Sequence, residues 1–302
     1  MIKNFDELLA TAKNVKGKRV VVIYPNNEET LSAVIDGCKH KLAGFILVGD
    51  KDVITKKIGD NIPSEVEIVQ EPVVGKAIQK SIELVREGKG DILLKGGVDT
   101  ATMMRALLQE EAGLRKGKLL SDVMLVEFPE RKDNRIIMIT DGGLTLAPDL
   151  KDKVELIKNA VEVAHALGNE NPKVAVLSAS EFINPNLQST VDAAALAKMN
   201  ERGQIKGCIV DGPLALDNAV STEAAGEKGL KSPVAGCADI LLLPNIEAAN
   251  IFAKGTTYFA HLRLAHVIIG GTIPILIPSR ADKSDAKLLS IALGVIMVGH
   301  NG

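Results

Sequence analysis

The chain has 302 residues, of which 46% are hydrophobic and 25% are charged. This composition can bury a large core and excludes an intrinsically disordered protein, and the length favours two lobes over one. The formal net charge of -2 provides no global attraction for nucleic acid or for an anionic membrane surface, so we expect neither as a partner.

The amino-terminal stretch MIKNFDELLATAKN predicts a short amphipathic helix and lacks the apolar core of a signal peptide. The three cysteines, Cys38, Cys208 and Cys237, are odd in number and lack CxxC spacing, which argues against a disulfide framework or a structural zinc site. Gly and Pro interrupt the longest apolar stretches before the ~18 residues that a membrane span needs. We therefore expect a cytoplasmic protein with reduced thiols.

Short β-branched runs alternate with helical segments along most of the chain. The predicted strands are residues 19–25, 44–50, 91–97, 122–128, 135–143, 173–180, 207–213, 239–245, 265–271 and 273–279. Apolar residues at three- and four-residue intervals predict helices between most of them, for example at residues 71–88, 150–168, 187–202 and 246–260. Near-continuous apolar strands joined by helices indicate an α/β fold of mostly parallel sheets covered on both faces.

One sheet of ten strands would be unusually wide, which is a second reason to expect two lobes. Gly142, Gly143 and Pro148 interrupt the pattern before a long helix, and a second seam is predicted near residues 270–271. We therefore predict a first α/β lobe formed by residues 1–141 plus 276–302, and a second formed by residues 142–275. The cleft between the lobes is the expected place for a ligand.

Several predicted strands end in a polar turn, most of them containing glycine. The turns are Lys95-Gly96-Gly97, Asp141-Gly142-Gly143, Ser178-Ala179-Ser180, Asp211-Gly212-Pro213 and Pro244-Asn245. Parallel strand ends meet at one edge, and glycine lets backbone N–H groups approach a ligand, so these turns predict a polar binding cleft. We count Asp211 and Asn245 among its substrate-binding candidates. The alternative is a set of ordinary tight turns.

The segment KGGVDTATMMR has the features of a phosphate-binding turn. It combines Lys95, expected exposed backbone amides around Gly96, Thr100 near a helix start, and Arg105 one to two turns later. The order GxxxxGK[ST] is absent, so the segment is not a P-loop. An ordinary tight turn is again the alternative.

The segment PSRADKSD joins the last predicted strand to the last helix. Ser279 or Asp282 can cap that helix without any chemistry, whereas a hydroxyl, a guanidinium and carboxylates at a strand end can also form a site. The five histidines are scattered without an HExxH pattern, so we expect no metal site. Ser178 lacks a GxSxG elbow, which disfavours a hydrolase triad.

The run CIVDGPLALDNAVSTEAAGEKGLKSPVAGCADILLLPNIEAANIFAKG carries the elements DGPL, SPVAG and AN-I-x-x-K in order. It resembles the phosphate acetyltransferase and phosphate butyryltransferase family, and the similarity extends to VAVLSAS, MITDGG, GVDTATMMR and PSR. The resemblance implies acyl transfer between coenzyme A and inorganic phosphate, with coenzyme A as a substrate and no permanently bound cofactor. It also implies a two-lobed fold of the isocitrate and isopropylmalate dehydrogenase type, and a homodimer or larger homo-oligomer.

In that family a Ser-Arg pair and a nearby Asp are held responsible for catalysis, and the resemblance assigns the pair to Ser279 and Arg280. The acidic position falls on Ala286, one residue past Asp285, so the base stays open between Asp285, Asp282 and neither. Because Asp282 is the natural cap of a helix that starts near it, Asp285 is the better candidate. Arg105 matches an arginine expected near a phosphate group.

The chemistry suits these residue types, because thiol attack on an acyl phosphate needs a proton acceptor, a cation at the phosphate and a donor for the oxyanion. The acetyl branch has an arginine where this chain has Glu29, and PSRAD is more like the butyryl branch, so butyryl is the expected acyl group. The alternatives are a phosphate acetyltransferase, a nicotinamide-dependent decarboxylating dehydrogenase and a non-catalytic coenzyme A binding protein.

Overall fold

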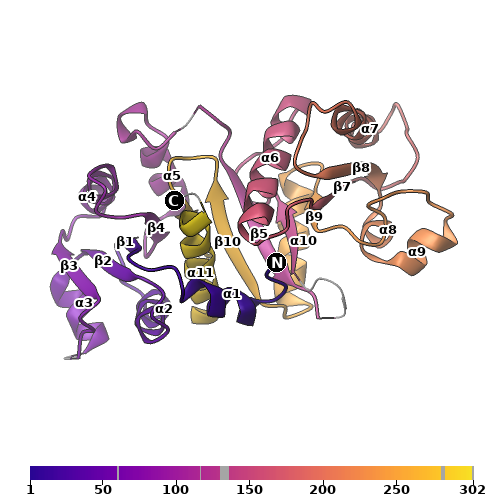
Figure 1. Ribbon diagram of the computed structural model, residues 1–302. Helices are drawn as coiled ribbons and strands as arrows, with labels where there is room; N and C mark the ends of the chain where they lie inside the picture. The colour runs from indigo at the N-terminus through magenta and orange to yellow at the C-terminus, as the bar shows by residue number, and fades with distance from the viewer. Residues whose placement is uncertain (60, 116, 130–135, 280–282, 301–302) are drawn as a thin grey trace. The chain divides into compact units, whose positions relative to one another are not determined.

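The computed structural model describes residues 1–59, 61–115, 117–129, 136–279 and 283–300 (Figure 1). The chain divides into two compact units, and each is described by itself below. Unit 1 contains Met1–Asn4 and Leu119–Arg263, and unit 2 contains Phe5–Lys118 and Leu264–Gly302.

Unit 2 contains six strands in the order β3-β2-β1-β4-β11-β10. Neighbouring strands are parallel except for β10 and β11, which are antiparallel. The elements of this unit are α1 (Phe5–Ala12), β1 (Arg19–Ile23), α2 (Glu28–Lys39), β2 (Gly44–Gly49), α3 (Lys51–Ile58), β3 (Val66–Gln70), α4 (Val74–Arg86), β4 (Ile92–Lys95), α5 (Thr100–Leu107), the 3-10 helix η1 (Glu110–Ala112), β10 (Leu264–Ile269), β11 (Ile275–Leu276) and α11 (Ser284–His300).

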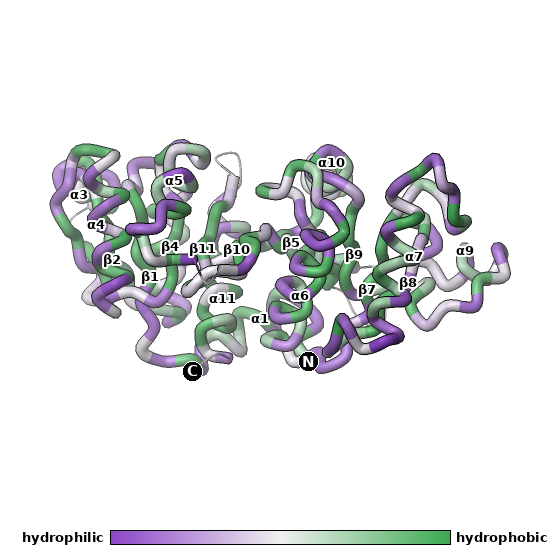
Figure 2. The backbone as a smooth tube through the Cα atoms, turned by 90° about the horizontal axis from the view of Figure 1, so that it is seen from above, coloured by the Kyte–Doolittle hydropathy of each residue, from purple (hydrophilic) through white to green (hydrophobic). Residues whose placement is uncertain are grey.

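The strands of unit 2 lie between two layers of helices. In Figure 2 they form a row in largely hydrophobic colours, with α4 and α5 on one side and α1 and α11 on the other. Strands β1, β2 and β4 are buried over almost their whole length, which fits their β-branched and leucine-rich sequences. Asn27, Asp50 and Asp99 cap helices α2, α3 and α5 through side-chain oxygens.

Unit 1 contains five strands in the order β5-β6-β9-β7-β8. Strands β5 and β6 form an antiparallel pair, and β6, β9, β7 and β8 are parallel neighbours. The elements of this unit are β5 (Ser121–Glu127), β6 (Ile136–Thr140), α6 (Leu150–Ala166), β7 (Lys173–Leu177), α7 (Gln188–Glu201), β8 (Ile209–Leu214), α8 (Leu216–Val220), α9 (Thr222–Glu227), β9 (Ile240–Leu242) and α10 (Ile246–Tyr258).

Helices cover both faces of the unit 1 strands as well. Helix α6 packs on β5, β6 and β9, while α10 packs on β6 from the other side (Figure 2). A capping box between Asp149 and Asp152 starts α6, and the Asn245 side chain starts α10. The carboxyl ends of β6, β9, β7 and β8 therefore meet at one edge of this unit.

The α/β fold of mostly parallel strands between helices is confirmed, and all ten predicted strands are present. Most predicted ranges extend into the polar turns that follow the strands. The turn predicted at Asp211-Gly212-Pro213 is wrong, because these residues lie inside β8 at an irregularity in its pairing with β7. Strand β3 was not predicted, because it is a partly exposed edge strand with an alternating pattern and no apolar run. Within the described part of the chain, no helix is long and apolar enough to cross a membrane.

The boundaries of the two units differ from the seams that the sequence predicts at 141/142 and 275/276. Strands β5 and β6 form a pair, and β6 continues to β9, so residues 121–140 belong with unit 1. Strand β10 pairs with β11, which pairs with β4, so both belong to unit 2. Pairing between strands sets the divisions, whereas glycine and proline mark only local turns.

Candidate functional site

The carboxyl edge of unit 2 brings together the predicted residues Lys95, Gly96 and Ser279. Strands β4 and β11 are parallel neighbours with Leu276 opposite Leu94. Lys95 ends β4, and Ser279 follows β11 by three residues, so both leave the sheet at the same edge. Lys95 is buried, whereas Ser279 is exposed. We call these three residues, together with Thr100, Arg105 and Asp285 of the helices that follow them, the unit 2 edge.

Glycine is required at positions 96 and 97, because a side chain at either position would clash with the end of β1 or the residues just after it. A Cβ atom at Gly96 would lie 2.5 Å from the carbonyl oxygen of Ile23, and one at Gly97 would lie 1.5 Å from Oδ1 of Asn26. The Gly96 and Gly97 N–H groups donate to the carbonyl oxygens of Ile23 and Tyr24, at 3.0 and 2.8 Å. The prediction of exposed amides is therefore wrong for these two residues, because Ile23 at the end of β1 and Tyr24 just after it accept their hydrogen bonds.

Helix α5 starts beside this turn. Asp99 accepts hydrogen bonds from the backbone N–H and the hydroxyl of Thr102, at 2.8 and 3.0 Å, and so caps the helix. Thr100 is its first residue, as predicted, and Arg105 lies in its last turn with an exposed side chain. Arg105 is therefore accessible to an anionic ligand.

The segment after β11 leads from Ser279 into α11. The described helix begins at Ser284, and Asp285 lies exposed in its first turn. Lys287 is almost fully buried, and its Nζ donates to the carbonyl oxygen of Ser279 at 3.3 Å. Arg280 and Asp282, and with them the predicted cap at Asp282, lie outside the described residues.

The carboxyl edge of unit 1 is organised around Asp141, which was predicted only as part of a polar turn. Its Oδ1 accepts from the N–H groups of Gly143 and Leu144, at 2.9 and 3.1 Å. Its Oδ2 accepts from the N–H and the hydroxyl of Thr145, at 3.0 and 2.9 Å. Asp141 therefore holds the turn after β6 in place.

Burial raises the pKa of Asp141 to about 6, and the neighbouring Asp122 carboxylate adds to the shift. The hydrogen bonds from Gly143, Thr145 and Leu144 act in the opposite direction, because they favour the ionised form. Sequence reasoning missed this pair, since Asp122 lies within an apolar strand and the pairing of β5 with β6 brings it near Asp141.

Ser178 and Asn245 follow β7 and β9 at the same edge, whereas Asp211 lies inside β8, opposite Ala175 of β7. Asp211 Oδ1 accepts from the N–H of Gly212 at 2.9 Å. Asn245 Oδ1 accepts from the N–H of Ala248 at 2.9 Å and so caps α10. Ser178 and Ser189 share a hydroxyl–hydroxyl hydrogen bond of 2.8 Å. We call Asp141, Ser178, Asp211 and Asn245 the unit 1 edge.

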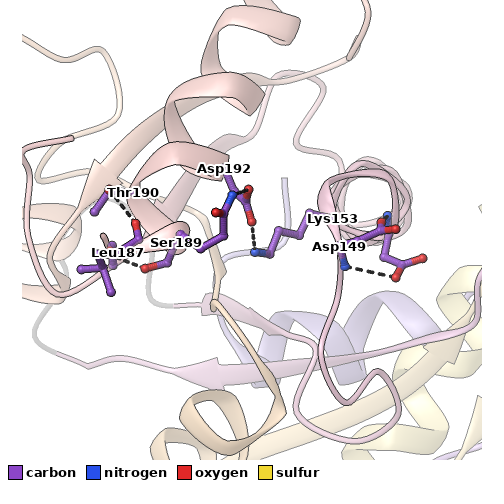
Figure 3. A network of polar contacts seen from close by, with 9 residues as sticks. Asp149, Lys153, Leu187, Ser189, Thr190 and Asp192 are labelled. Carbon is purple, nitrogen blue, oxygen red and sulfur yellow. Dashed lines mark hydrogen bonds and ion pairs between the residues drawn. The ribbon is translucent and has the colours of Figure 1, made fainter. Parts of the chain in front are cut away.

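A buried ion pair joins α6 to α7 in unit 1. Figure 3 shows Lys153 reaching to Asp192, with Nζ and Oδ2 2.6 Å apart. The side chains are 5% and 10% exposed, and Gln188 donates to the other carboxylate oxygen at 2.7 Å. Loss of one partner would leave a charge buried without compensation, so the pair acts as a structural tie between the helices.

The cysteines offer little reactivity. Burial raises the pKa of Cys38 and of Cys208 to about 11, so both thiols stay protonated near neutral pH. Cys237 is partly exposed, and Lys173 Nζ donates to its Sγ at 3.0 Å. Among the described residues, no group of three or more His, Cys, Asp or Glu side chains is arranged to hold a metal ion.

An apolar cavity of about 400 Å³ lies in unit 1 between the sheet and α10. Val126, Ile137, Ile139 and Leu241 form its sheet side. Helix α10 starts at the carboxyl edge and runs away from it, and its second half lines the cavity, as does Ile137 near the start of β6. Leu216 and Val220 of α8 complete the lining, which is apolar.

Comparison with known proteins shows the family of this chain. Residues 61–295 match the phosphate acetyl/butaryl transferase family. The chain belongs to this family. It is 46% identical to the phosphate butyryltransferase of Clostridium acetobutylicum, over 99% of this chain and 100% of the relative. It is 42% identical to the phosphate acetyltransferase of Thermotoga maritima, over 97% of this chain and 99% of the relative.

Two solved structures extend the comparison. A branched-chain phosphotransacylase from Enterococcus faecalis matches with a TM-score of 0.81 and 30% identity, over 93% of this chain and 99% of that one. A 4-hydroxythreonine-4-phosphate dehydrogenase from Klebsiella pneumoniae matches with a TM-score of 0.58 and 12% identity, over 93% of this chain and 99% of that one. The second likeness shows the fold alone, and it agrees with the predicted dehydrogenase-like architecture.

Proposed function

We propose that this chain is a phosphate acyltransferase that moves a short acyl group between coenzyme A and inorganic phosphate. The reaction is acyl-CoA + phosphate = acyl phosphate + CoA, by direct transfer in a ternary complex. The observation that carries the proposal is the match over nearly the whole chain to relatives named phosphate butyryltransferase and phosphate acetyltransferase. Family membership alone leaves the acyl group and the residue roles to be argued from the chain.

The catalytic roles belong to the segment after β11. In the direction that forms acyl-CoA, the thiol sulfur attacks the acyl carbon, the thiol proton passes to the carboxylate of Asp285, and the bond to phosphate breaks. The Arg280 guanidinium stabilises the phosphate, and the Ser279 hydroxyl donates to the developing oxyanion. The exposure of Ser279 and Asp285 at the unit 2 edge supports these assignments. An acyl phosphate is already activated, so positioning carries much of the rate.

The anionic groups of the substrates need cations and hydrogen-bond donors. We propose that Lys95, Thr100 and Arg105 serve them at the unit 2 edge, and that Asp211 and Asn245 contact substrate at the unit 1 edge. The N–H of Gly96 donates to Ile23 of β1 and is not available to a substrate. We propose that Gly96 instead contributes by having no side chain, which leaves room for a substrate. Coenzyme A enters as a substrate and not as a resident cofactor.

We propose butyryl as the preferred acyl group, because Glu29 and the PSRAD segment are more like the butyryl branch. The relatives include an acetyltransferase at 42% identity, so the chain length needs a direct test. The experiment compares kcat/KM for acetyl-, propionyl-, butyryl- and isobutyryl-CoA with phosphate. A higher value for butyryl-CoA supports the proposal, and a higher value for acetyl-CoA replaces it with phosphate acetyltransferase.

The same samples separate the other candidate activities. A nicotinamide absorbance change with hydroxy acids would indicate a dehydrogenase, which the fold alone suggests. Coenzyme A binding without turnover would indicate a non-catalytic binding protein. Acyl transfer predicts release of coenzyme A that depends on phosphate, with no nicotinamide signal.

We also propose a cytoplasmic homo-oligomer, at least a dimer. The cysteines are free thiols, which fits a reducing compartment. Phe259, which lines the apolar cavity of unit 1, is 90% exposed, and Tyr258 and Ile251 of α10 are 59% and 71% exposed. Exposed apolar clusters commonly mark interaction surfaces. Light scattering after size exclusion gives the molar mass, and a mass equal to that of one chain would contradict the proposal.

A further inference from the structure

Lys287 is a buried lysine next to the proposed catalytic segment. The residue is 2% exposed and is the only charged residue in the buried stretch of α11 from Lys287 to Met297. Its Nζ donates to the carbonyl oxygen of Ser279 at 3.3 Å. Removing an ammonium group from water is costly unless acceptors replace the lost hydration. The Ser279 carbonyl is one of those acceptors.

Helix α11, which carries Lys287, packs tightly against the strands of unit 2. The Ser290 hydroxyl donates to the carbonyl oxygen of Ala286 at 2.8 Å and accepts from the N–H of His266 on β10 at 2.9 Å. A Cβ atom at Gly294 would lie 3.2 Å from Ile92 and 3.3 Å from Leu276. Helix α11 is therefore pressed against β4 and β11, the strands that carry Lys95 and lead to Ser279.

A hydrogen bond to the Ser279 carbonyl orients the peptide plane that joins Ser279 to the next residue. The peptide unit is planar, so a fixed carbonyl limits rotation about the Cα–C bond of Ser279 and with it the direction of the Ser279 side chain relative to that plane. The Ser279 hydroxyl is exposed at the unit 2 edge, and its role as an oxyanion donor depends on its direction.

We propose that Lys287 is a positioning residue for acyl transfer, which holds the Ser279 carbonyl and thereby orients the Ser279 hydroxyl. The inference rests on the proposed function. Lys287 acts through Ser279 and makes no substrate contact, so its loss lowers kcat and leaves KM nearly unchanged. A misplacement of ~1 Å can cost about a hundredfold in rate, so the expected loss is about tenfold to a hundredfold.

The first experiment compares Lys287→Met with Lys153→Met. Methionine keeps an unbranched apolar side chain and removes the ammonium group in both variants. Lys153 is the matched control, because it is also a buried lysine but pairs with Asp192 in unit 1. We expect both changes to lower thermal stability. Only Lys287→Met lowers kcat of the folded fraction, at KM values for butyryl-CoA and phosphate within about twofold of the parent.

A second variant, Lys287→Gln, covers the case in which Lys287→Met does not fold. Glutamine keeps an N–H donor but is shorter, so it holds the Ser279 carbonyl less well. We expect kcat of Lys287→Gln to be about threefold or more below the parent, and above that of a folded Lys287→Met. A folded Lys287→Gln with parental kcat would overturn the proposal, as would a variant in which KM rises and kcat does not change.

A readout that needs no activity separates this inference from the proposed function. Hydrogen exchange of the peptide that spans residues 276–286 is measured in the parent, Lys287→Gln and Lys153→Met. We expect faster exchange in Lys287→Gln alone. If the parent releases no coenzyme A from butyryl-CoA and phosphate, the proposed function fails. The hydrogen-exchange rates still test whether Lys287 holds the Ser279 carbonyl. Unchanged exchange in Lys287→Gln would show that Lys287 does not hold the segment.

Discussion

At the unit 1 edge, Asp141 binds its own turn with both carboxylate oxygens, and Asn245 caps α10 with its amide oxygen. At the unit 2 edge, backbone contacts between Gly96, Gly97 and β1 hold the turn, while Ser279 and Asp285 are exposed. The two edges therefore differ: polar side chains hold turns and helix starts at the unit 1 edge, whereas at the unit 2 edge backbone hydrogen bonds hold the turn and two polar residues are exposed. Exposed polar side chains on a backbone that is held by other groups are suited to chemistry.

The largest expected effect is at Arg280. A fixed cation at the transferred phosphate has no equivalent in bulk water, and losing such a contact costs ~3 kcal/mol, about a hundredfold in rate. We therefore expect Arg280→Ala to lower kcat/KM by about a hundredfold without unfolding. The exposed Arg202 at the end of α7 provides the control, Arg202→Ala, with parental activity. A loss of less than about threefold at Arg280 would remove it from the mechanism.

The next effect separates the two carboxylates near α11. We expect Asp285→Asn to lower kcat by about tenfold or more at nearly unchanged melting temperature, because the amide cannot accept the thiol proton. Asp282→Asn keeps a capping oxygen, so it changes activity and stability only slightly.

The pH dependence of the rate tests this assignment. The acidic limb of the profile should disappear in Asp285→Asn and remain in Asp282→Asn. The reverse result would make Asp282 the base, and a limb that survives in both variants would exclude both carboxylates.

Asn245 tests whether a cap at the unit 1 edge also contacts substrate. Aspartate is as good a cap as asparagine, so Asn245→Asp should leave the melting temperature within a few degrees of the parent. Its added negative charge repels phosphate groups, and we expect KM for phosphate or coenzyme A to rise by about threefold or more. Unchanged KM values would assign Asn245 to capping alone.

The smallest effect concerns the pH dependence of stability at Asp141. Its pKa is raised from 3.8 to about 6, so the folded state holds a proton more tightly than the unfolded state between these values. Its contribution to stability therefore decreases as pH rises through this window and levels off above about 6. Asp122→Asn removes one cause of the shift, so the decrease should become smaller and move to lower pH.

Urea unfolding at several pH values between about 4 and 7 measures this change. Glu223→Gln, an exposed carboxylate in the same unit, is the control and should keep the parental slope. A parental slope in Asp122→Asn would show that burial alone raises the pKa of Asp141.

The fold was largely predictable from the sequence, because buried parallel strands are continuous apolar runs and their helices have regular periodicity. Strand β3 was missed because an edge strand does not need an apolar run. The unit boundaries were missed because glycine and proline report local turns, whereas the pairing of β6 with β9 joins residues far apart in the sequence.

For the candidate site, sequence reasoning found residue types at strand ends but not the partners of their polar atoms. It could not show that Ile23 and Tyr24, at and just after the end of β1, accept the Gly96 and Gly97 hydrogen bonds, since that depends on the neighbouring strand. Lys287 did leave a signal, as a lone charge in the apolar helix AKLLSIALGVIMV. Its contact with Ser279 could not be predicted, because it depends on how α11 packs against β11.

The most direct test of the central claim is phosphorus NMR of a reaction containing the protein, butyryl-CoA and phosphate, with free thiol measured in parallel. Acyl transfer predicts one butyryl phosphate for each coenzyme A released, and no release when phosphate is omitted. Release of coenzyme A without phosphate, with no acyl phosphate signal, would indicate a hydrolase and contradict the account.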